Sequence, residues 1–135
     1  MPLTRPCRDK PATSLAGRRI LVAEDEYLVA RDIVDIIAGA GGEVVGPVPT
    51  VPEALALARS EVIGAALLDV NLRGEMVFPV IERLRGRGVP VVLVTGFRAE
   101  ILPVSFRDLP HLEKPYDPDA LLRIVRRTCA EVGLP

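Results

Sequence analysis

From Arg18 onward, short runs of apolar, β-favouring residues alternate with longer stretches in which apolar residues recur at helical spacing. This order is typical of the α/β class, in which helices cover both faces of a parallel sheet. Five strands are predicted, at Arg19–Ala23, Glu43–Pro47, Gly64–Leu68, Pro90–Val94 and around Leu112–Glu113. We therefore expect a doubly wound sheet with strand order 2-1-3-4-5.

The helices are predicted from apolar stripes and from residues that begin or end a helix. The first helix ends at Gly41 and Gly42, and Thr50 and Glu53 have the capping-box spacing that begins a second helix running to about Ser60. The last begins at Asp117, an N-cap residue followed by proline. The expected inward stripes are Val29, Ile33, Ile36, Ile37 and Ala40 in the first helix, Val77, Ile81 and Leu84 in a third over Val77–Arg85, and Leu121, Leu122, Val125 and Cys129 in the last.

The fourth helix is the exception to this regular pattern. Pro103 interrupts it after Ile101 and Leu102, and Leu109 and Pro110 follow soon afterwards. Since proline removes a backbone donor and clashes with the preceding turn, we expect this helix to be short or irregular.

The size and charge of the chain narrow its class. Its 135 residues suit one compact domain. Its 17 basic residues nearly balance its 18 acidic ones, so the chain has no strong electrostatic field that would attract nucleic acid or a membrane. Two cysteines are too few for a disulfide framework, and no apolar run could span a membrane, which together indicate a cytoplasmic protein. We expect residues 1–17 to form a flexible leader, residues 18–133 to form the folded domain, and no effector domain to follow.

Polar side chains gather where the predicted strands end. Glu24-Asp25-Glu26 follows the first strand, Asp69-Val70-Asn71 the third, Thr95-Gly96 the fourth and Lys114-Pro115 the fifth. Taken singly, each group suits an ordinary turn or cap. With the predicted strand order, however, the first and third strands are neighbours, so Asp25 and Asp69 would share one pocket at the carboxyl edge of the sheet.

Carboxylates held so close together need a cation. Like charges about 4 Å apart repel by several kcal/mol at an effective dielectric near 20, and oxygen ligands favour a hard metal such as Mg²⁺. Lys114 could hold an anion opposite the metal, leaving the Asp69 carboxylate to attack a phosphoryl group in line. The residues therefore predict that Asp69 is phosphorylated.

The motifs "ILVAEDE", "LLDVNL", "VTG" and "EKP", in this order and spacing, resemble the receiver domain of bacterial two-component response regulators over nearly all of residues 19–132. The resemblance implies a CheY-like, flavodoxin-like (βα)5 fold. It further implies that Glu24 and Asp25 support Mg²⁺ with Asp69, that Asn71 gives the metal its backbone carbonyl, and that Glu26 is a solvated neighbour. Asp69 would be the phosphoacceptor, Thr95 the hydroxyl that moves onto the phosphoryl group, and Lys114 its cationic partner, with a cis peptide bond to Pro115.

Two further positions are switch candidates by the same resemblance. His111, the one histidine, stands three residues before Lys114, where the family usually carries an aromatic residue that moves with the threonine. It is equally expected to be a half-buried ring at a strand edge. Phe97 stands near the phosphoryl site, where it could limit the approach of water or serve only in packing.

A narrower resemblance concerns stand-alone receivers known mainly from alphaproteobacteria, whose motif runs Pro-Phe-x-Phe-Ala-Thr-Gly-Tyr. This chain has "PVVLVTGF", with Val91, Leu93, Val94 and Phe97 where the motif has Phe, Phe, Ala and Tyr. Such a protein would receive its phosphoryl group from a sensor histidine kinase or phosphotransfer protein. It would signal through protein contact or onward phosphotransfer, using the face formed by the fourth helix, fifth strand and fifth helix, with no direct binding of nucleic acid or membrane.

Three alternatives belong to other functional classes. A Mg²⁺-dependent aspartyl phosphohydrolase would need an aspartate two residues after its nucleophile, where this chain has Asn71, which cannot act as a general acid. A flavin-binding protein would need phosphate donors where Glu24-Asp25-Glu26 is acidic. A phosphorylation-independent adaptor would have no reason to keep mutually repelling carboxylates. We therefore expect a phosphorylation switch rather than an enzyme.

Overall fold

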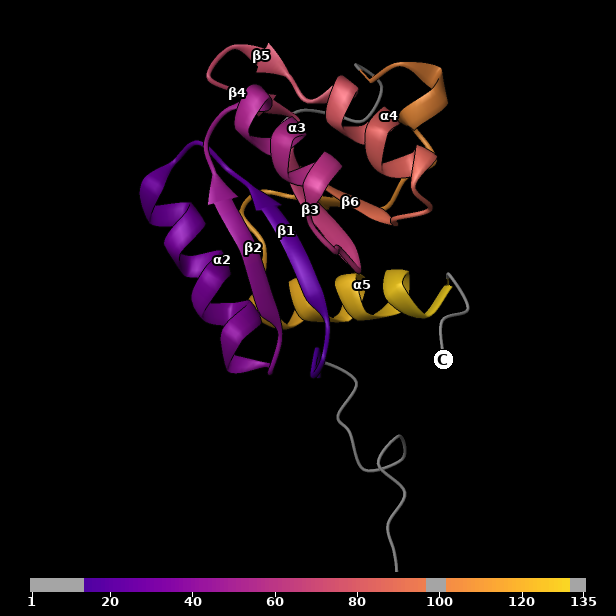
Figure 1. Ribbon diagram of the computed structural model, residues 1–135. Coiled ribbons are helices and arrows are strands. Elements are labelled where there is room, and N and C mark those ends of the chain that lie inside the picture. The colour runs from indigo at the N-terminus through magenta and orange to yellow at the C-terminus, as the bar shows by residue number, and fades with distance from the viewer. Residues whose placement is uncertain (1–13, 97–101, 132–135) are drawn as a thin grey trace, which may run out of the picture.

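The computed structural model describes residues 14–96 and 102–131. Five parallel strands form a sheet in the order β2-β1-β3-β6-β7 (Figure 1). The strands are β1 (Arg19–Ala23), β2 (Glu43–Val48), β3 (Ala65–Asp69), β6 (Val91–Thr95) and β7 (His111–Glu113). The strands β4 and β5 form a separate small hairpin, so β6 and β7 are the fourth and fifth strands of the main sheet. The expected fold class and the strand order 2-1-3-4-5 are therefore confirmed.

Helices cover both faces of the sheet, as the sequence predicts (Figure 1). The helices α2 (Tyr27–Gly39) and α5 (Pro118–Glu131) pack on one face, and α3 (Val51–Ser60) and α4 (Phe78–Gly86) on the other. Along β1, Ile20 and Val22 pack into the core under α2 and α5, whereas Leu21 and Ala23 pack into the core under α3 and α4. Because successive side chains of a strand point to opposite faces, an unbroken apolar run fills both cores.

The start of α3 shows how local sequence sets an element. The Thr50 hydroxyl oxygen accepts the Glu53 backbone N–H at 3.3 Å and donates to the Glu53 carboxylate at 2.7 Å. Capping of this kind satisfies a donor that the first helical turn leaves free.

The region of the expected fourth helix is irregular. The described part contains only a three-residue 3₁₀ helix, η2 (Val104–Phe106), which begins directly after Pro103. Residues 97–101 lie outside the described part, and Phe97 is among them.

Three features depart from the sequence-based expectations. A hairpin of β4 (Asn71–Leu72) and β5 (Glu75–Met76) lies between β3 and α4. Leu15, which falls within the expected leader, is completely buried in the core beneath α2 and α5, so the packed chain begins before residue 18. The peptide bond from Gly46 to Pro47 is cis, inside β2. Within residues 14–96 and 102–131, no helix has both the length and the apolar character needed to cross a membrane.

Candidate functional site

Three carboxylates meet at the carboxyl edge of the sheet, as the strand order predicts. Ala23 of β1 and Leu68 of β3 are paired in register, so the residues that follow each strand emerge side by side. One oxygen from each of Glu24, Asp25 and Asp69 lies within 4.8 Å of the other two. Glu24 is 2% exposed and Asp69 is 9% exposed, so two of the three negative groups have little water around them.

Lys114 provides the positive charge at this edge. Its Nζ lies 2.9 Å from Asp69 Oδ2, 3.0 Å from Glu24 Oε1 and 3.4 Å from Glu26 Oε1. Burial opposes the charge on the ammonium, but the hydrogen bonds to Asp69 and Glu24 outweigh it and raise the pKa of Lys114. Lys114 therefore stays protonated and holds the two carboxylates together.

The backbone at the end of β7 fixes the position of this lysine. Its N–H donates to the Thr95 carbonyl oxygen at 3.0 Å, which joins the ends of β6 and β7. The peptide bond from Lys114 to Pro115 is cis.

Backbone donors orient each of the three carboxylates. Glu24 Oε2 accepts the Glu26 N–H at 3.1 Å, and Asp69 Oδ1 accepts the Asn71 N–H at 3.1 Å. Asp25 Oδ2 accepts the N–H of Arg73, a residue 48 positions later in the chain, at 2.8 Å. The carboxylates are thus held in place by the protein itself.

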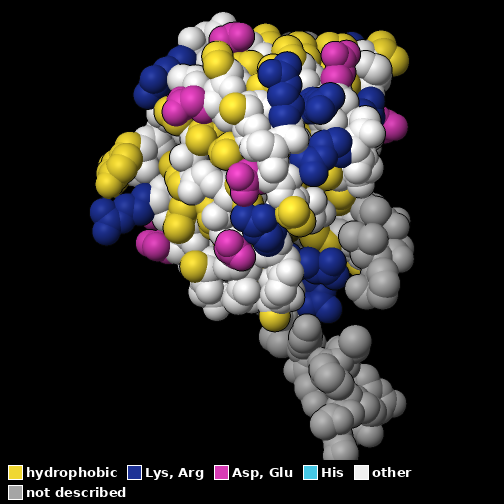
Figure 2. All heavy atoms as spheres, in the orientation of Figure 1, with side chains coloured by type: hydrophobic (Ala, Val, Ile, Leu, Met, Phe, Trp, Pro, Cys, Tyr) yellow, Lys and Arg dark blue, Asp and Glu magenta, His cyan; other side chains and the backbone are white. Residues whose placement is uncertain are grey.

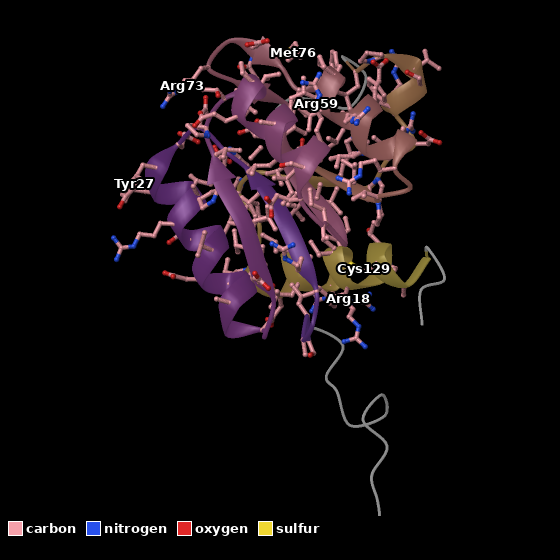
Figure 3. The ribbon with its side chains drawn as sticks, in the orientation of Figure 1. Arg18, Tyr27, Arg59, Arg73, Met76 and Cys129 are labelled. Atoms are coloured by element: carbon pink, nitrogen blue, oxygen red, sulfur yellow. The ribbon has the colours of Figure 1, made fainter. Side chains whose placement is uncertain are left out.

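The β4–β5 hairpin supplies the donor to Asp25, and sequence reasoning missed it. Arg73 and Gly74 form its turn with φ of 53° and 86°, and the Asn71 side-chain oxygen accepts the Gly74 N–H at 2.8 Å. Two consecutive residues with positive φ are typical of the tight turns that join hairpin strands. Figure 3 labels Arg73 at this turn and Met76 on β5. In the sequence, the only signal for this turn was the Arg73-Gly74 pair, because glycine favours the positive φ that such turns require.

The pKa of Glu24 reflects mainly the burial of its carboxyl group. Burial raises the pKa of Glu24 from its ordinary value of 4.5 to about 7, and the negative charge of Asp69 adds to the effect. The backbone N–H of Glu26 and the ammonium of Lys114 act in the opposite direction without cancelling it. Glu24 therefore binds a proton more readily than an exposed glutamate does.

The donor set fits a hard divalent cation. Glu24, Asp25 and Asp69 offer only oxygen atoms, the ligands that Mg²⁺ prefers, and their distances let one ion contact all three. A second cation would also offset the negative charge of Asp69, which contributes to the raised pKa of Glu24. Asn71 lies next to the cluster through its hydrogen bond to Asp69, while the role of its backbone carbonyl toward a metal stays a prediction.

The remaining candidates lie along β6 and β7. Thr95 ends β6, is 4% exposed and is paired in register with Glu113. His111 is half-buried and paired with Leu93, and among the described residues no hydrogen-bond partner is found for its buried Nε2. Glu26 is mostly exposed, with one oxygen near Lys114. The switching roles of Thr95, His111 and Phe97 stay predictions.

Several known proteins are similar to this chain in sequence and structure. No family model matches this chain. The protein SdrG from Sphingomonas melonis Fr1, known from a solution structure, is 38% identical with a TM-score of 0.72, and the match covers 87% of this chain and 97% of SdrG. The response regulator PhyR from Brucella abortus is 31% identical with a TM-score of 0.76, and the match covers 89% of this chain and 51% of PhyR.

A curated relative shows the same partial coverage. The transcriptional regulatory protein PdtaR from Mycobacterium tuberculosis is 30% identical over 118 residues, which are 84% of this chain and 57% of PdtaR. The chain thus spans little more than half the length of PdtaR and about half that of PhyR. What these longer proteins do as a whole is not carried over to this chain.

Proposed function

This chain belongs to the CheY-like receiver domains of response regulators, and on that premise we propose that it is a switch phosphorylated on Asp69. The proposed donor is a sensor histidine kinase or a phosphotransfer protein. The observation that carries the proposal is the position of Asp69, whose two oxygens face Lys114 and the Asn71 N–H while the acidic groups of Glu24 and Asp25 lie beside it.

The proposed chemistry uses groups that are already in place. An Asp69 oxygen attacks phosphorus, the P–N bond to the donor imidazole breaks, and its electron pair stays on the ring nitrogen, so an acyl phosphate forms on Asp69. Lys114, charged and 2.9 Å from Asp69 Oδ2, neutralises charge on the transferred group. Mg²⁺ bound by Glu24, Asp25 and Asp69, with the Asn71 carbonyl, would supply further neutralisation of the phosphoryl oxygens.

The proposed output is a change at the neighbouring surface. Thr95 ends the strand beside β3, and its hydroxyl is proposed to turn toward the phosphoryl group. β7 lies beside β6 at that edge of the sheet, and the η2 segment, β7 and α5 are the proposed contact surface for a downstream protein. Onward phosphotransfer is the other proposed output. Membership in the stand-alone alphaproteobacterial subgroup is also a proposal, and its support is the "VLVTGF" sequence.

No separate enzymatic activity is proposed. Asn71, at the position where a phosphohydrolase would need a general acid, uses its side-chain oxygen to accept the Gly74 N–H. A cytoplasmic location is part of the proposal, because two cysteines, of which Cys129 is a buried free thiol, suit a reducing compartment.

Phosphorylation by a small phosphodonor tests the assignment. With Mg²⁺ present, the wild-type chain should gain one acid-labile phosphate, and Asp69→Ala should gain none. The matched control is Asp119→Asn, an exposed carboxylate in the first turn of α5 that should leave labelling unchanged. Labelling that persists in Asp69→Ala would exclude Asp69 as the phosphoacceptor. A wild type that neither takes phosphate nor binds Mg²⁺ would favour the adaptor alternative.

A further inference from the structure

A groove lies beside the phosphorylation site, on the α2 side of the molecule. Its volume is about 510 Å³, and it runs between α2 and the segment that joins β7 to α5. Asp32 and Asp35 are exposed along it, while Lys114 lies at one end with its ammonium already bound by Asp69 and Glu24. The other lining residues are mainly apolar: Val29, Ile36, Pro115, Tyr116 and Pro118.

A second hollow continues this groove toward the beginning of the described chain. Its volume is about 390 Å³, and it shares Asp35, Ile36 and Pro118 with the first. Ser14 lines it together with residues of α2 and α5. The combined surface, here called the α2 groove, therefore runs from Ser14 to Lys114.

The start of the described chain is fixed at one end of the α2 groove. The Ser14 carbonyl oxygen accepts from Arg126 Nη1 at 2.7 Å, and the Leu15 N–H donates to the Ala40 carbonyl oxygen at 2.9 Å. Leu15 is completely buried. Residues 1–13 are thus attached where the α2 groove begins.

The sequence of residues 1–13 complements the α2 groove. Arg5, Arg8 and Lys10 against Asp9 give its side chains a net charge of +2, from three basic residues minus one acidic residue. At about 3.1 Å per residue, 13 residues of fully extended backbone would span about 40 Å. An α-helix as long as α2, 13 residues, spans about 20 Å. The segment is long enough to follow the whole groove.

The opposite face of the molecule is electrostatically unsuitable for this segment. The hollow between α3 and α4 is lined by Arg59, Arg83 and Arg87, with Glu82 as its one acidic residue. Lys and Arg side chains gather on this face in Figure 2, and Figure 3 labels Arg59 there. A segment of charge +2 is repelled by this face and attracted by Asp32 and Asp35.

We propose that residues 1–13 of this chain bind along the α2 groove, with their basic side chains facing Asp32 and Asp35 and their apolar residues against Ile36 and Tyr116. Because the segment is tethered at Ser14, its effective concentration at the groove is in the millimolar range, so weak contacts suffice.

The chain carries its own attachment point for a test. Cys7 lies within the segment, whereas Cys129 is completely buried and burial raises the pKa of its thiol, so a thiol-reactive nitroxide should label Cys7. In the full-length labelled protein, the amide NMR signals of Asp32, Ile36 and Tyr116 should broaden, and those of Arg59 and Arg83 should not. A Cys7→Ser chain, which should take no label, gives the reference spectrum. Broadening confined to the residues next to Ser14 would overturn the proposal.

Charge reversal separates specific binding from chance proximity. Asp32→Lys with Asp35→Lys should abolish the broadening at Tyr116, and adding Arg5→Glu, Arg8→Glu and Lys10→Glu should restore it. Both aspartates are exposed, so the fold should tolerate their replacement. The matched control, Glu82→Lys on α4, should change nothing. Equal broadening with and without the aspartates would refute the pairing. Since the readout is binding, it does not depend on phosphorylation of Asp69.

Discussion

The two halves of the carboxyl edge of the sheet are built in different ways. At the ends of β1 and β3, carboxylates, backbone N–H groups and Lys114 contact one another directly. Beyond β6, packing contributes more: the Phe78 and Phe106 rings lie 5.3 Å apart, and the Arg85 guanidinium lies 5.3 Å from the centre of the Phe106 ring. Changes in the first half should therefore depend on pH and Mg²⁺, whereas changes in the second should not.

The largest expected effect comes from removing the positive charge of the first half. Lys114→Met leaves Glu24 and Asp69 buried without their cation, which should lower the free energy of unfolding by about 3 kcal/mol. Urea denaturation in a chelating buffer measures the loss. Mg²⁺ should recover part of it, since a divalent ion would again neutralise the carboxylates.

The matched control removes a positive charge elsewhere. Arg123→Met, on the exposed side of α5, should change stability by less than about 0.5 kcal/mol. Equal losses of stability in Lys114→Met and Arg123→Met would contradict a special contribution of the Lys114 ion pairs to the first half.

A smaller effect should appear as a dependence of stability on pH. The pKa of Glu24 is raised to about 7 by burial, from an ordinary value of 4.5, so the folded state binds this proton more tightly than the unfolded state does. The resulting stabilisation is complete below the unfolded pKa and is lost as pH rises through about 7. Urea midpoints of the metal-free protein should follow this trend.

Glu24→Gln isolates the contribution of this one group. The variant has no proton to lose, so the difference in stability between the variant and the wild type should grow in the variant's favour as pH rises through about 7. A difference that stays constant with pH would show that Glu24 does not titrate in this range.

The smallest effect is expected at His111, the first residue of β7. His111 Nε2 is buried, and no hydrogen-bond partner is found for it among the described residues, so His111→Phe should raise the free energy of unfolding by about 1 kcal/mol. The gain should not depend on Mg²⁺. His111→Gln keeps a polar group there and should give no gain. A destabilising Phe would contradict the absence of a hydrogen-bond partner for the imidazole among the described residues.

The meeting of Glu24, Asp25 and Asp69 could be predicted from sequence because parallel topology fixes it. Once β1 and β3 are neighbours that end at the same edge, the residues that follow them must approach each other. Lys114 was found in the same way, through the end of β7. The contacts between the Lys114 ammonium and the carboxylates of Glu24 and Asp69 follow from their opposite charges once these side chains lie close together.

What could not be predicted depends on single contacts rather than on periodic patterns. The β4–β5 hairpin has strands of two residues, too short to show alternation, and Arg73 adopts a positive φ that its residue type does not favour. Leu15 is one apolar residue in a segment without helical or strand spacing, so its burial was invisible. Both contacts join segments that lie far apart in the sequence.

The hydrogen bond from the Arg73 amide to Asp25 has a practical consequence. The amide proton lies in the β4–β5 turn and is hydrogen-bonded to the Asp25 carboxylate, one of the three that could hold a divalent ion. Coordination of this carboxylate would therefore change the electron density around the proton. Its chemical shift and its rate of exchange with deuterium therefore form a native reporter on the occupancy of the acidic cluster. An experimenter could follow ion binding through this amide in the unaltered chain, without a dye, an isotope-substituted metal or a substitution.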